Sequence, residues 1–372
     1  MNYSFSQMIT YYILFILILI YVIVNYKLTD GSKKLSYHTI GVVLLLFAGF
    51  RGMNVDFDYK SYLEIYNKIS SIQSFFFNPI YLFNKLQYEP SILIIFSLVK
   101  SLFNSGFQIA IFLYAFISIG LKLRAIPKLT DFVPYSLLLF FSSIYLLQDF
   151  AQIRAAVASG FLLLSIPFIV SKDIKKFSVF VLLAVFFHYS AIIFAPLYFL
   201  NTKKINKALY ITVIIVSIIL AVLRFTPFDF IAKFDLGIYS KKINLYLVGQ
   251  QWEKRQINIF NFSILLQIAI SIFFIFFAEK TNNKYAVILT KICTIGIVLF
   301  YLFSSAPVIA FRLSDLLGMV QIILIPFILY FIKPKYIGEL IIVIIALAFF
   351  LNQILINPIL HPYKTFFNQF QQ

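Results

Sequence analysis

The sequence predicts an all-α integral membrane protein whose chain crosses the bilayer many times. Of its 372 residues, 62% are hydrophobic and only 12% are charged, whereas soluble domains are closer to half apolar. Apolar runs recur along the whole chain, and they do not alternate with polar residues as the strands of a barrel would. In lipid such runs form helices, because a helix satisfies its own backbone hydrogen bonds. We therefore expect about twelve transmembrane helices in a single membrane domain over residues 1–372.

The apolar runs define the individual predicted spans, in order along the chain. They cover roughly residues 9–26, 38–50, 107–123, 132–147, 155–171, 207–225, 259–278, 285–305, 313–332 and 337–355. The first run follows no basic segment and precedes no small-residue cleavage site. It therefore predicts a retained helix rather than a signal peptide.

Two further apolar regions do not have the length of an ordinary span. Residues 91–104 contain Lys100 and are shorter than the roughly 17 to 20 residues that a perpendicular span needs. Residues 177–200 are long for one helix and short for two, with His188 in the middle. Both regions suggest backbone that enters the membrane without crossing it, which is tolerated only beside protein or a water-filled cavity.

The basic residues predict the topology and account for the net charge of +17. They gather in short loops, namely 27–34, 172–176, 203–207 and 333–335. The positive-inside rule places such loops in the cytoplasm, so the charge indicates orientation and predicts no nucleic-acid partner. The two larger hydrophilic loops, 51–89 and 226–258, then face outward. Counting spans between the basic loops also requires 177–200 to form a hairpin or re-entrant pair with His188 at its tip.

The first outer loop opens with a cluster of chemically useful side chains. The sequence Arg51-Gly-Met-Asn-Val-Asp-Phe-Asp-Tyr-Lys-Ser-Tyr62 holds two carboxylates, an arginine and two tyrosines in a chain with only 14 acidic residues. Asp56 and Asp58 could hold a divalent cation against phosphates, or one of them could act as a general base oriented by Arg51. The plainer alternative is a solvated loop.

Further candidates lie at the predicted outer ends of helices. Arg154 opens a helix rich in small residues, and its guanidinium fork suits bidentate recognition of phosphate. The alternative is an ion pair with Asp149. Glu89, followed by Pro90, is a candidate catalytic carboxylate, although acids and prolines also occur in the first turn of helices simply as caps.

Two candidates come later in the chain. His188 could donate to a phosphate oxygen or a sugar hydroxyl, or could simply bond a backbone carbonyl. Arg312 could converge with Arg154 on a diphosphate, or could pair with Asp315 on its own helix. The lone Cys293 excludes an intrachain disulfide and a cysteine metal site. The chain has no Gly-x-x-x-x-Gly-Lys phosphate loop and no His-Glu-x-x-His helix, whereas transport remains open.

Together these segments resemble the EpsG family of Wzy-like O-antigen and exopolysaccharide polymerases. The resemblance rests on Arg51, Asp58-Tyr59-x-x-Tyr62, Glu89-Pro90, Ile153-Arg154-Ala155 and Leu183-Ala184-x-x-Phe187-His188-x-Ser190-Ala191, with Arg312 as a looser match. Each is weak alone, but their order and spacing are fairly specific. The chain departs from the pattern at Asp56, where the family usually has glycine, and at Ala155, where glutamine is common.

The resemblance implies a multi-span glycosyltransferase of GT-C-like architecture in the bacterial cytoplasmic membrane, with its site facing outward and no cofactor. Such enzymes join undecaprenyl-diphosphate-linked oligosaccharide repeat units into O-antigen, capsule or exopolysaccharide. Membrane lipid is a further expected partner, and a chain-length regulator is left open.

The roles that this implies are shared between two groups of residues. Asp58 would take the acceptor proton, with His188 or Glu89 as other candidates for chemistry. Arg154 and Arg312 would neutralise the departing diphosphate. Arg51, Tyr59 and Tyr62 would complete the binding of substrate.

Two alternatives remain. One is a transferase that uses a polyprenyl-phosphate sugar, or an O-antigen ligase, in which Asp56 and Asp58 would bind a metal. The other is a flippase or transporter for the same lipid-linked sugars.

Overall fold

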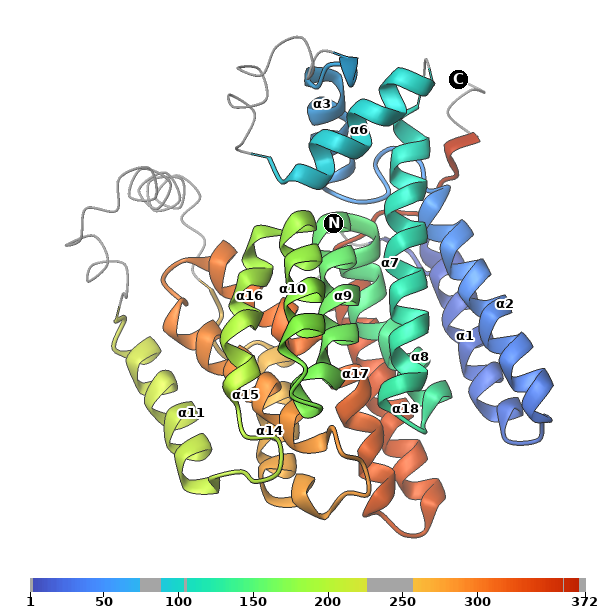
Figure 1. Cartoon of the computed structure of the whole chain (residues 1–372). Helices are drawn as coiled ribbons and strands as arrows, with labels where there is room; N and C mark the ends of the chain where they lie inside the picture. Colours follow the sequence, from blue (N-terminus) through green and yellow to red (C-terminus); the bar gives the residue numbers. More distant parts are fainter. Residues whose placement is uncertain (1–2, 74–87, 104–105, 226–256, 357, 368–372) are drawn as a thin grey trace, which may run out of the picture. The chain divides into compact units, whose positions relative to one another are not determined.

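The computed structural model describes residues 3–73, 88–103, 106–225, 257–356 and 358–367 (Figure 1). Over these residues the chain is helical, and β-structure is limited to two isolated bridges. Seven helices within these described ranges are long and apolar enough to cross a membrane: Ser6–Asn25, Phe107–Leu129, Val133–Ala151, Ile153–Val170, Phe262–Lys280, Pro307–Tyr330 and Lys335–Ile356. The predicted all-α, polytopic class is confirmed. The number twelve and the GT-C-like arrangement stay predictions.

The helices form two compact units, one from Met1–Ala195 with Ile325–Gln372 and the other from Pro196–Leu324. The expectation of one membrane domain concerns both units together and stays a prediction. The outer loop expected at 226–258 lies outside the described residues, apart from its last two.

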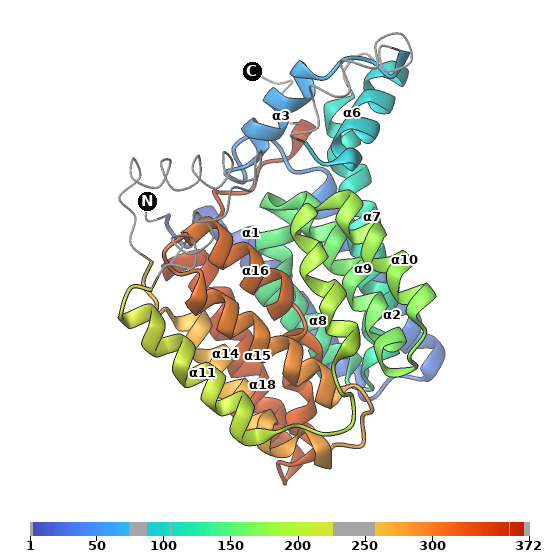
Figure 2. The same ribbon diagram turned by 60° about the vertical axis from the view of Figure 1, so that its left-hand side comes forward.

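The first unit contains the N-terminal helices together with the C-terminal helices of the chain. Its helices are η1 (Ser6–Met8), α1 (Ile9–Asn25), α2 (Asp30–Gly49), α3 (Tyr59–Lys68), α6 (Pro90–Leu102), α7 (Phe107–Leu129), α8 (Val133–Leu139), the π-helix η2 (Phe140–Ala151), α9 (Ile153–Val170), α10 (Ile174–Phe187), the start of the 3-10 helix η3 (Tyr189–Phe199), η5 (Ile325–Tyr330), α18 (Lys335–Leu351) and the π-helix η6 (Asn352–Ile356). The helix α9 packs between α7 and α10, and α2 packs on α7 (Figures 1 and 2).

Small residues on α9 allow its close approach to α7. The side chains of Ala156, Ala158 and Ser159 are fully buried. A Cβ atom added at Gly160 would collide with Leu121 of α7. Because apolar lipid gives helices no hydrophobic reason to associate, tight van der Waals packing of this kind holds them together. The small residues therefore hold α9 against α7. This contact also positions the first turn of α9, which carries Arg154, the residue predicted to bind phosphate.

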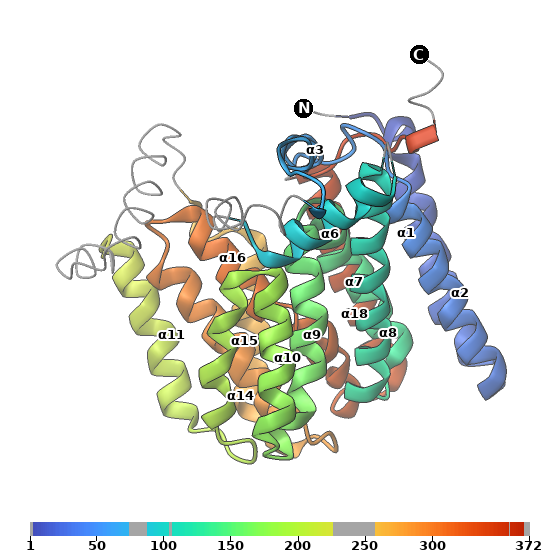
Figure 3. The same ribbon diagram turned by 45° about the horizontal axis from the view of Figure 1, so that its top comes forward.

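Both regions that were too short or too irregular for a span are short elements in the structure. The run predicted at 91–104 is α6, a helix of 13 residues. The region 177–200 is interrupted at His188, whose φ of −152° and ψ of 113° are extended. The predicted break at His188 is confirmed, with α10 before it and the 3-10 helix η3 after it. Figures 1 and 3 show α3 and α6 gathered at the end of α7 where that helix begins.

The C-terminal segment lies against the first outer loop, a contact that the sequence did not predict. Isolated antiparallel bridges join Arg51 to Thr365 and Asp56 to Leu360. The N–H of His361 also donates to the carbonyl of Val55, at 2.9 Å. The loop is therefore held by a part of the chain some 300 residues away in sequence.

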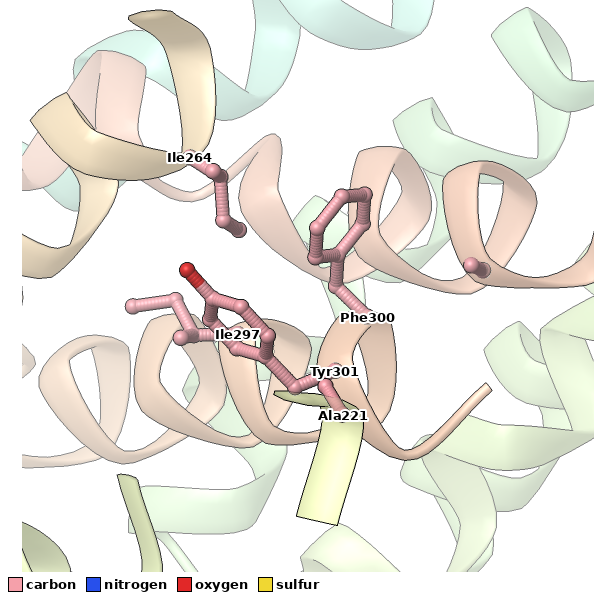
Figure 4. Packing of buried hydrophobic residues seen from close by; sticks show 6 residues of the cluster. Ala221, Ile264, Ile297, Phe300 and Tyr301 are labelled. Atoms are coloured by element: carbon pink, nitrogen blue, oxygen red, sulfur yellow. The ribbon is translucent and has the colours of Figure 1, made fainter. Parts of the chain in front are cut away.

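The second unit is a helical cluster centred on α15. It contains α11 (Lys207–Val222), α14 (Phe262–Phe277), η4 (Ala278–Lys280), α15 (Ala286–Leu302), α16 (Pro307–Gly318) and α17 (Gln321–Leu324), and α15 packs against each of these. Figure 4 shows the apolar contact among these helices, made by Ala221, Ile264, Ile297, Phe300, Tyr301 and Ala310. The hydroxyl of Tyr301 donates to the carbonyl of Ile259, so this tyrosine is buried without losing its hydrogen bond.

Candidate catalytic site

Three of the predicted site residues meet around the carboxylate of Glu89. Glu89 precedes Pro90 at the start of α6, but its side chain does not cap that helix. One carboxylate oxygen instead accepts a hydrogen bond from Nη1 of Arg154, and the other lies 3.2 Å from Nδ1 of His188. Glu89 and Pro90 do stand at the start of the helix, as the plainer explanation expected, but the side chain of Glu89 bridges an arginine and a histidine instead of bonding the helix.

Four segments bring this cluster together. Glu89 comes from the start of α6, Arg154 from the first turn of α9, and His188 from the extended residue that ends α10. The fourth is α3, whose Tyr62 places its hydroxyl 3.4 Å from Nε of Arg154 and its ring 5.5 Å from the guanidinium carbon. A cation held over an aromatic face and against a carboxylate has a fixed orientation.

The environment of Glu89 keeps it ionised. Glu89 is only 5% exposed, and burial raises its pKa. The hydrogen bond from His188 and the charge of Arg154 outweigh that effect and lower the pKa to about 2. A carboxylate with so low a pKa is a poor proton acceptor at neutral pH. Its geometry suits it to hold the arginine and the histidine.

The contact with Glu89 also determines which nitrogen of His188 carries a proton. An ionised carboxylate can only accept hydrogen bonds, so Nδ1 of His188 is the donor. The other ring nitrogen, Nε2, then has a lone pair when the ring is neutral. His188 is thereby prepared to accept a proton or a hydroxyl hydrogen bond through Nε2.

Arg154 is not paired with Asp149, which was the plainer alternative from the sequence. Asp149 lies in the π-helix η2 and forms a fully buried ion pair of 2.7 Å with Lys122, while also accepting from Ser118. The alternative is wrong because the helix breaks at Gln152 (φ −97°, ψ 53°) before α9 begins. The two residues therefore do not share one continuous helix face.

Arg51 is fully buried, and its guanidinium group is bonded to other groups of the protein. Its Nε donates to Oδ2 of Asp56 at 2.8 Å, Nη1 to the carbonyl of Ala48 at 2.6 Å, and Nη2 to the carbonyl of Phe150. All three nitrogens are thus engaged within the protein. These contacts join the outer loop to the end of η2, and the predicted role of Arg51 in binding substrate stays a prediction.

The two aspartates of the loop differ in their surroundings. Both oxygens of Asp56 are occupied, Oδ2 by Arg51 and Oδ1 by the backbone N–H groups of Asp58 and Tyr59. These three hydrogen bonds make Asp56 the acceptor that shapes the turn, and the metal site that Asp56 and Asp58 would share stays a prediction. Asp58 is partly exposed and lies close to Tyr62. Burial raises the pKa of Tyr62, and the charge of Asp58 raises it further.

Of the tyrosines on α3, the two predicted as site residues, Tyr59 and Tyr62, have different surroundings. The buried hydroxyl of Tyr59 donates to Gln108, which in turn donates to the carbonyl of Gly49. Burial raises the pKa of Tyr59 to about 12, so it stays a neutral donor. Tyr59 therefore anchors α3 on α7, and only Tyr62 reaches the Arg154 cluster.

Arg312 belongs to α16 in the second unit. Its predicted convergence with Arg154 stays a prediction. The sequence reasoning missed the ion pair of Lys122, because it counted this residue, at the end of the apolar run predicted at 107–123, with the basic residues of the loop that follows. A lysine inside such a run is a recognisable sign of a partner within the membrane.

The fold and the cluster define a polytopic membrane protein with a buried carboxylate that orients an arginine and a histidine at the end of a helical bundle. A family model described as the EpsG family matches residues 34–367, and the chain belongs to that family. The match covers every predicted site residue. The family is associated with polysaccharide polymerase activity of the glycosyltransferase type. No curated protein and no solved structure matches the chain.

Proposed function

We propose that the chain is a glycosyltransferase that joins undecaprenyl-diphosphate-linked oligosaccharide repeat units at the outer face of the bacterial cytoplasmic membrane. Family membership supports the polymerase class. We assign the catalytic site to this cluster because the carboxylate of Glu89 bridges Arg154 and His188. The basic loops 27–34 and 172–176 support an outward-facing site, since they lie at the ends of their helices away from this cluster.

Arg154 supplies the half of the site that binds the leaving group. A guanidinium carries five N–H donors, and its contacts with Glu89 and Tyr62 fix its plane without covering it, since the side chain is 23% exposed. Its charge stabilises the negative charge that grows on the lipid diphosphate as the sugar departs. Arg312 is a second candidate for the same role.

The reaction is a single displacement at the anomeric carbon. The acceptor hydroxyl oxygen forms the new bond to that carbon, the bond to the diphosphate oxygen breaks, and the diphosphate leaves with the electron pair. The acceptor proton passes to a base on the protein. Attack opposite the leaving group inverts the anomeric centre, and the energy comes from the sugar–diphosphate bond, so no cofactor takes part.

Two residues are candidates for the base. Asp58 was favoured by the sequence and is partly exposed on the outer loop. The geometry favours His188, because the ionised Glu89 holds its Nδ1–H and directs the basic Nε2 elsewhere. His188→Gln should then lower kcat by about 100-fold or more, the usual cost of losing a general base, whereas Asp58→Asn should change kcat much less.

The test uses purified full-length protein in liposomes supplied with lipid-linked repeat units, with product length followed on gels. Arg154→Ala should reduce chain lengthening by about 100-fold or more, the usual cost of losing a donor to a developing charge. Arg124→Ala is the matched control, because Arg124 is exposed near the far end of α7. Long chains made by Arg154→Ala would refute the role of Arg154.

The same assay separates the alternatives. Translocation of lipid-linked units without any change in chain length would favour a flippase. Loss of all activity in EDTA would favour a metal-dependent transferase or ligase in which Asp56 and Asp58 bind the metal.

A further inference from the structure

Within residues 51–62 of the outer loop, Phe57 presents an exposed aromatic ring to its surroundings. Phe57 stands between the two aspartates, and its side chain is 61% exposed. The carboxylate of Asp56 accepts the N–H groups of the two residues after Phe57, Asp58 and Tyr59, and pairs with Arg51 on the other side. This turn draws Asp56 inward and leaves Phe57 pointing out of the protein.

A neighbouring ring holds the exposed ring of Phe57 in position. It meets the ring of His361 edge-on, with the centroids 4.9 Å apart and the planes at 66°. His361 is itself fixed by three hydrogen bonds: its N–H donates to Val55, its carbonyl accepts from Tyr11, and its ring bonds the hydroxyl of Tyr3. An aromatic surface that is already oriented loses little entropy when a ligand covers it.

The surroundings of Phe57 are polar. Asn54, Lys60 and Ser61 are exposed, and Asp58 is partly exposed. By contrast Phe116, which is 56% exposed, lies in the apolar middle of α7 where lipid would cover it. The setting of Phe57 therefore suits a ligand with an apolar face and polar edges.

We propose that Phe57 and Asp58 form a subsite for the acceptor sugar, a role that rests on the proposed function. A pyranose presents C–H groups on one face, which stack on an aromatic ring, and hydroxyl groups at its edge, which donate to a carboxylate. Asp58 is next to the ring and provides that carboxylate. The helix α3 then links this subsite to Tyr62, whose hydroxyl is bonded to Arg154.

Binding can be tested without catalysis. The chain has one tryptophan, Trp252, so the double variant Phe57→Trp, Trp252→Phe reports on position 57 alone. Full-length protein in nanodiscs is titrated with the lipid-free oligosaccharide released by mild acid from the host's lipid-linked repeat units. We expect a saturable change in tryptophan emission that is weakened by Asp58→Asn and absent from Phe116→Trp, Trp252→Phe. No saturable change at position 57 would overturn the proposal.

Kinetics give the second test. Phe57→Leu keeps an apolar side chain but loses the flat ring, and should raise KM for the lipid-linked unit about tenfold while leaving kcat nearly unchanged. Phe57→Tyr and the control Phe116→Leu should behave like the wild type. An unchanged KM in Phe57→Leu, or an equal loss in Phe57→Tyr, would overturn the subsite.

The two proposals fail in distinguishable ways. A wild-type protein that binds the oligosaccharide at position 57 but never lengthens a chain contradicts only the polymerase function. A protein that polymerises normally with Phe57→Leu contradicts only the subsite.

Discussion

Replacing Glu89 by glutamine tests whether this carboxylate holds the site together. In the native protein both of its oxygens accept, one from Arg154 and the other from His188. A glutamine side chain has a single oxygen, and its NH2 group would face one of the two donors. The Glu89→Gln variant therefore loses a buried ion pair and leaves one donor unsatisfied.

The pKa of Glu89 sets the size of the effect. Folding lowers this pKa from its usual 4.5 to about 2, so the ionised carboxylate stabilises the native state at pH values above about 4.5. Each pKa unit corresponds to about 1.4 kcal/mol, which gives about 3 kcal/mol at neutral pH. This contribution falls to about half near pH 3 and is lost as the pH passes below about 2.

The assay is heat denaturation in detergent, with the folded fraction measured by size-exclusion chromatography from about pH 7 down to pH 3. We expect Glu89→Gln to be clearly less stable than the wild type at neutral pH and the difference to shrink as the solution becomes acidic. Glu64→Gln is the control, because Glu64 is exposed on α3. A difference that stays constant down to pH 3, or none at pH 7, would show that the ion pair does not stabilise the fold.

Two other buried ion pairs give matched predictions. Asp56→Asn should destabilise the protein by about 3–5 kcal/mol, because it leaves the fully buried charge of Arg51 unpaired. Adding Arg51→Met should restore part of that stability, and an additive double variant would contradict the coupling. Lys122→Met and Asp149→Leu should each cost a similar amount, whereas the double variant should fold nearly as stably as the wild type. Thermal denaturation of the four proteins in each cycle measures that cycle's coupling, and polymer length shows whether the pairs also position the site.

The sequence predicts the helices well because lipid leaves the backbone few alternatives. The span expected at 207–225 is α11, Lys207–Val222. The span expected at 38–50 begins earlier, at Asp30, because the side chain of Thr29 accepts from the N–H of Ser32 and caps a polar first turn. A search for apolar runs misses such turns, because it reads charge as the end of a helix.

The sequence also identifies the members of the site, but not their partners. Glu89 and Arg154 were selected as ionisable groups at the ends of apolar runs, and His188 as one in the middle of such a region, where ionisable groups are costly. That Glu89 would bridge the other two depends on contacts across 65 and 99 positions of the chain. Local spacing suggested Asp149 for Arg154 instead, and only the break in the helix between them excludes it.

The burial of Arg51 is best explained by the positions that it fixes. A buried ion pair is weak evidence for stability, since desolvation offsets most of its attraction, but it can specify one arrangement of the chain. Arg51 binds Asp56, which orients the turn that displays Phe57, and it binds the carbonyl of Phe150, just before the helix that begins with Arg154. Arg51 thus sets the distance between the proposed sugar subsite and Arg154, the residue proposed to bind phosphate. We therefore expect Arg51 to influence the proposed reaction through the positions of these two segments.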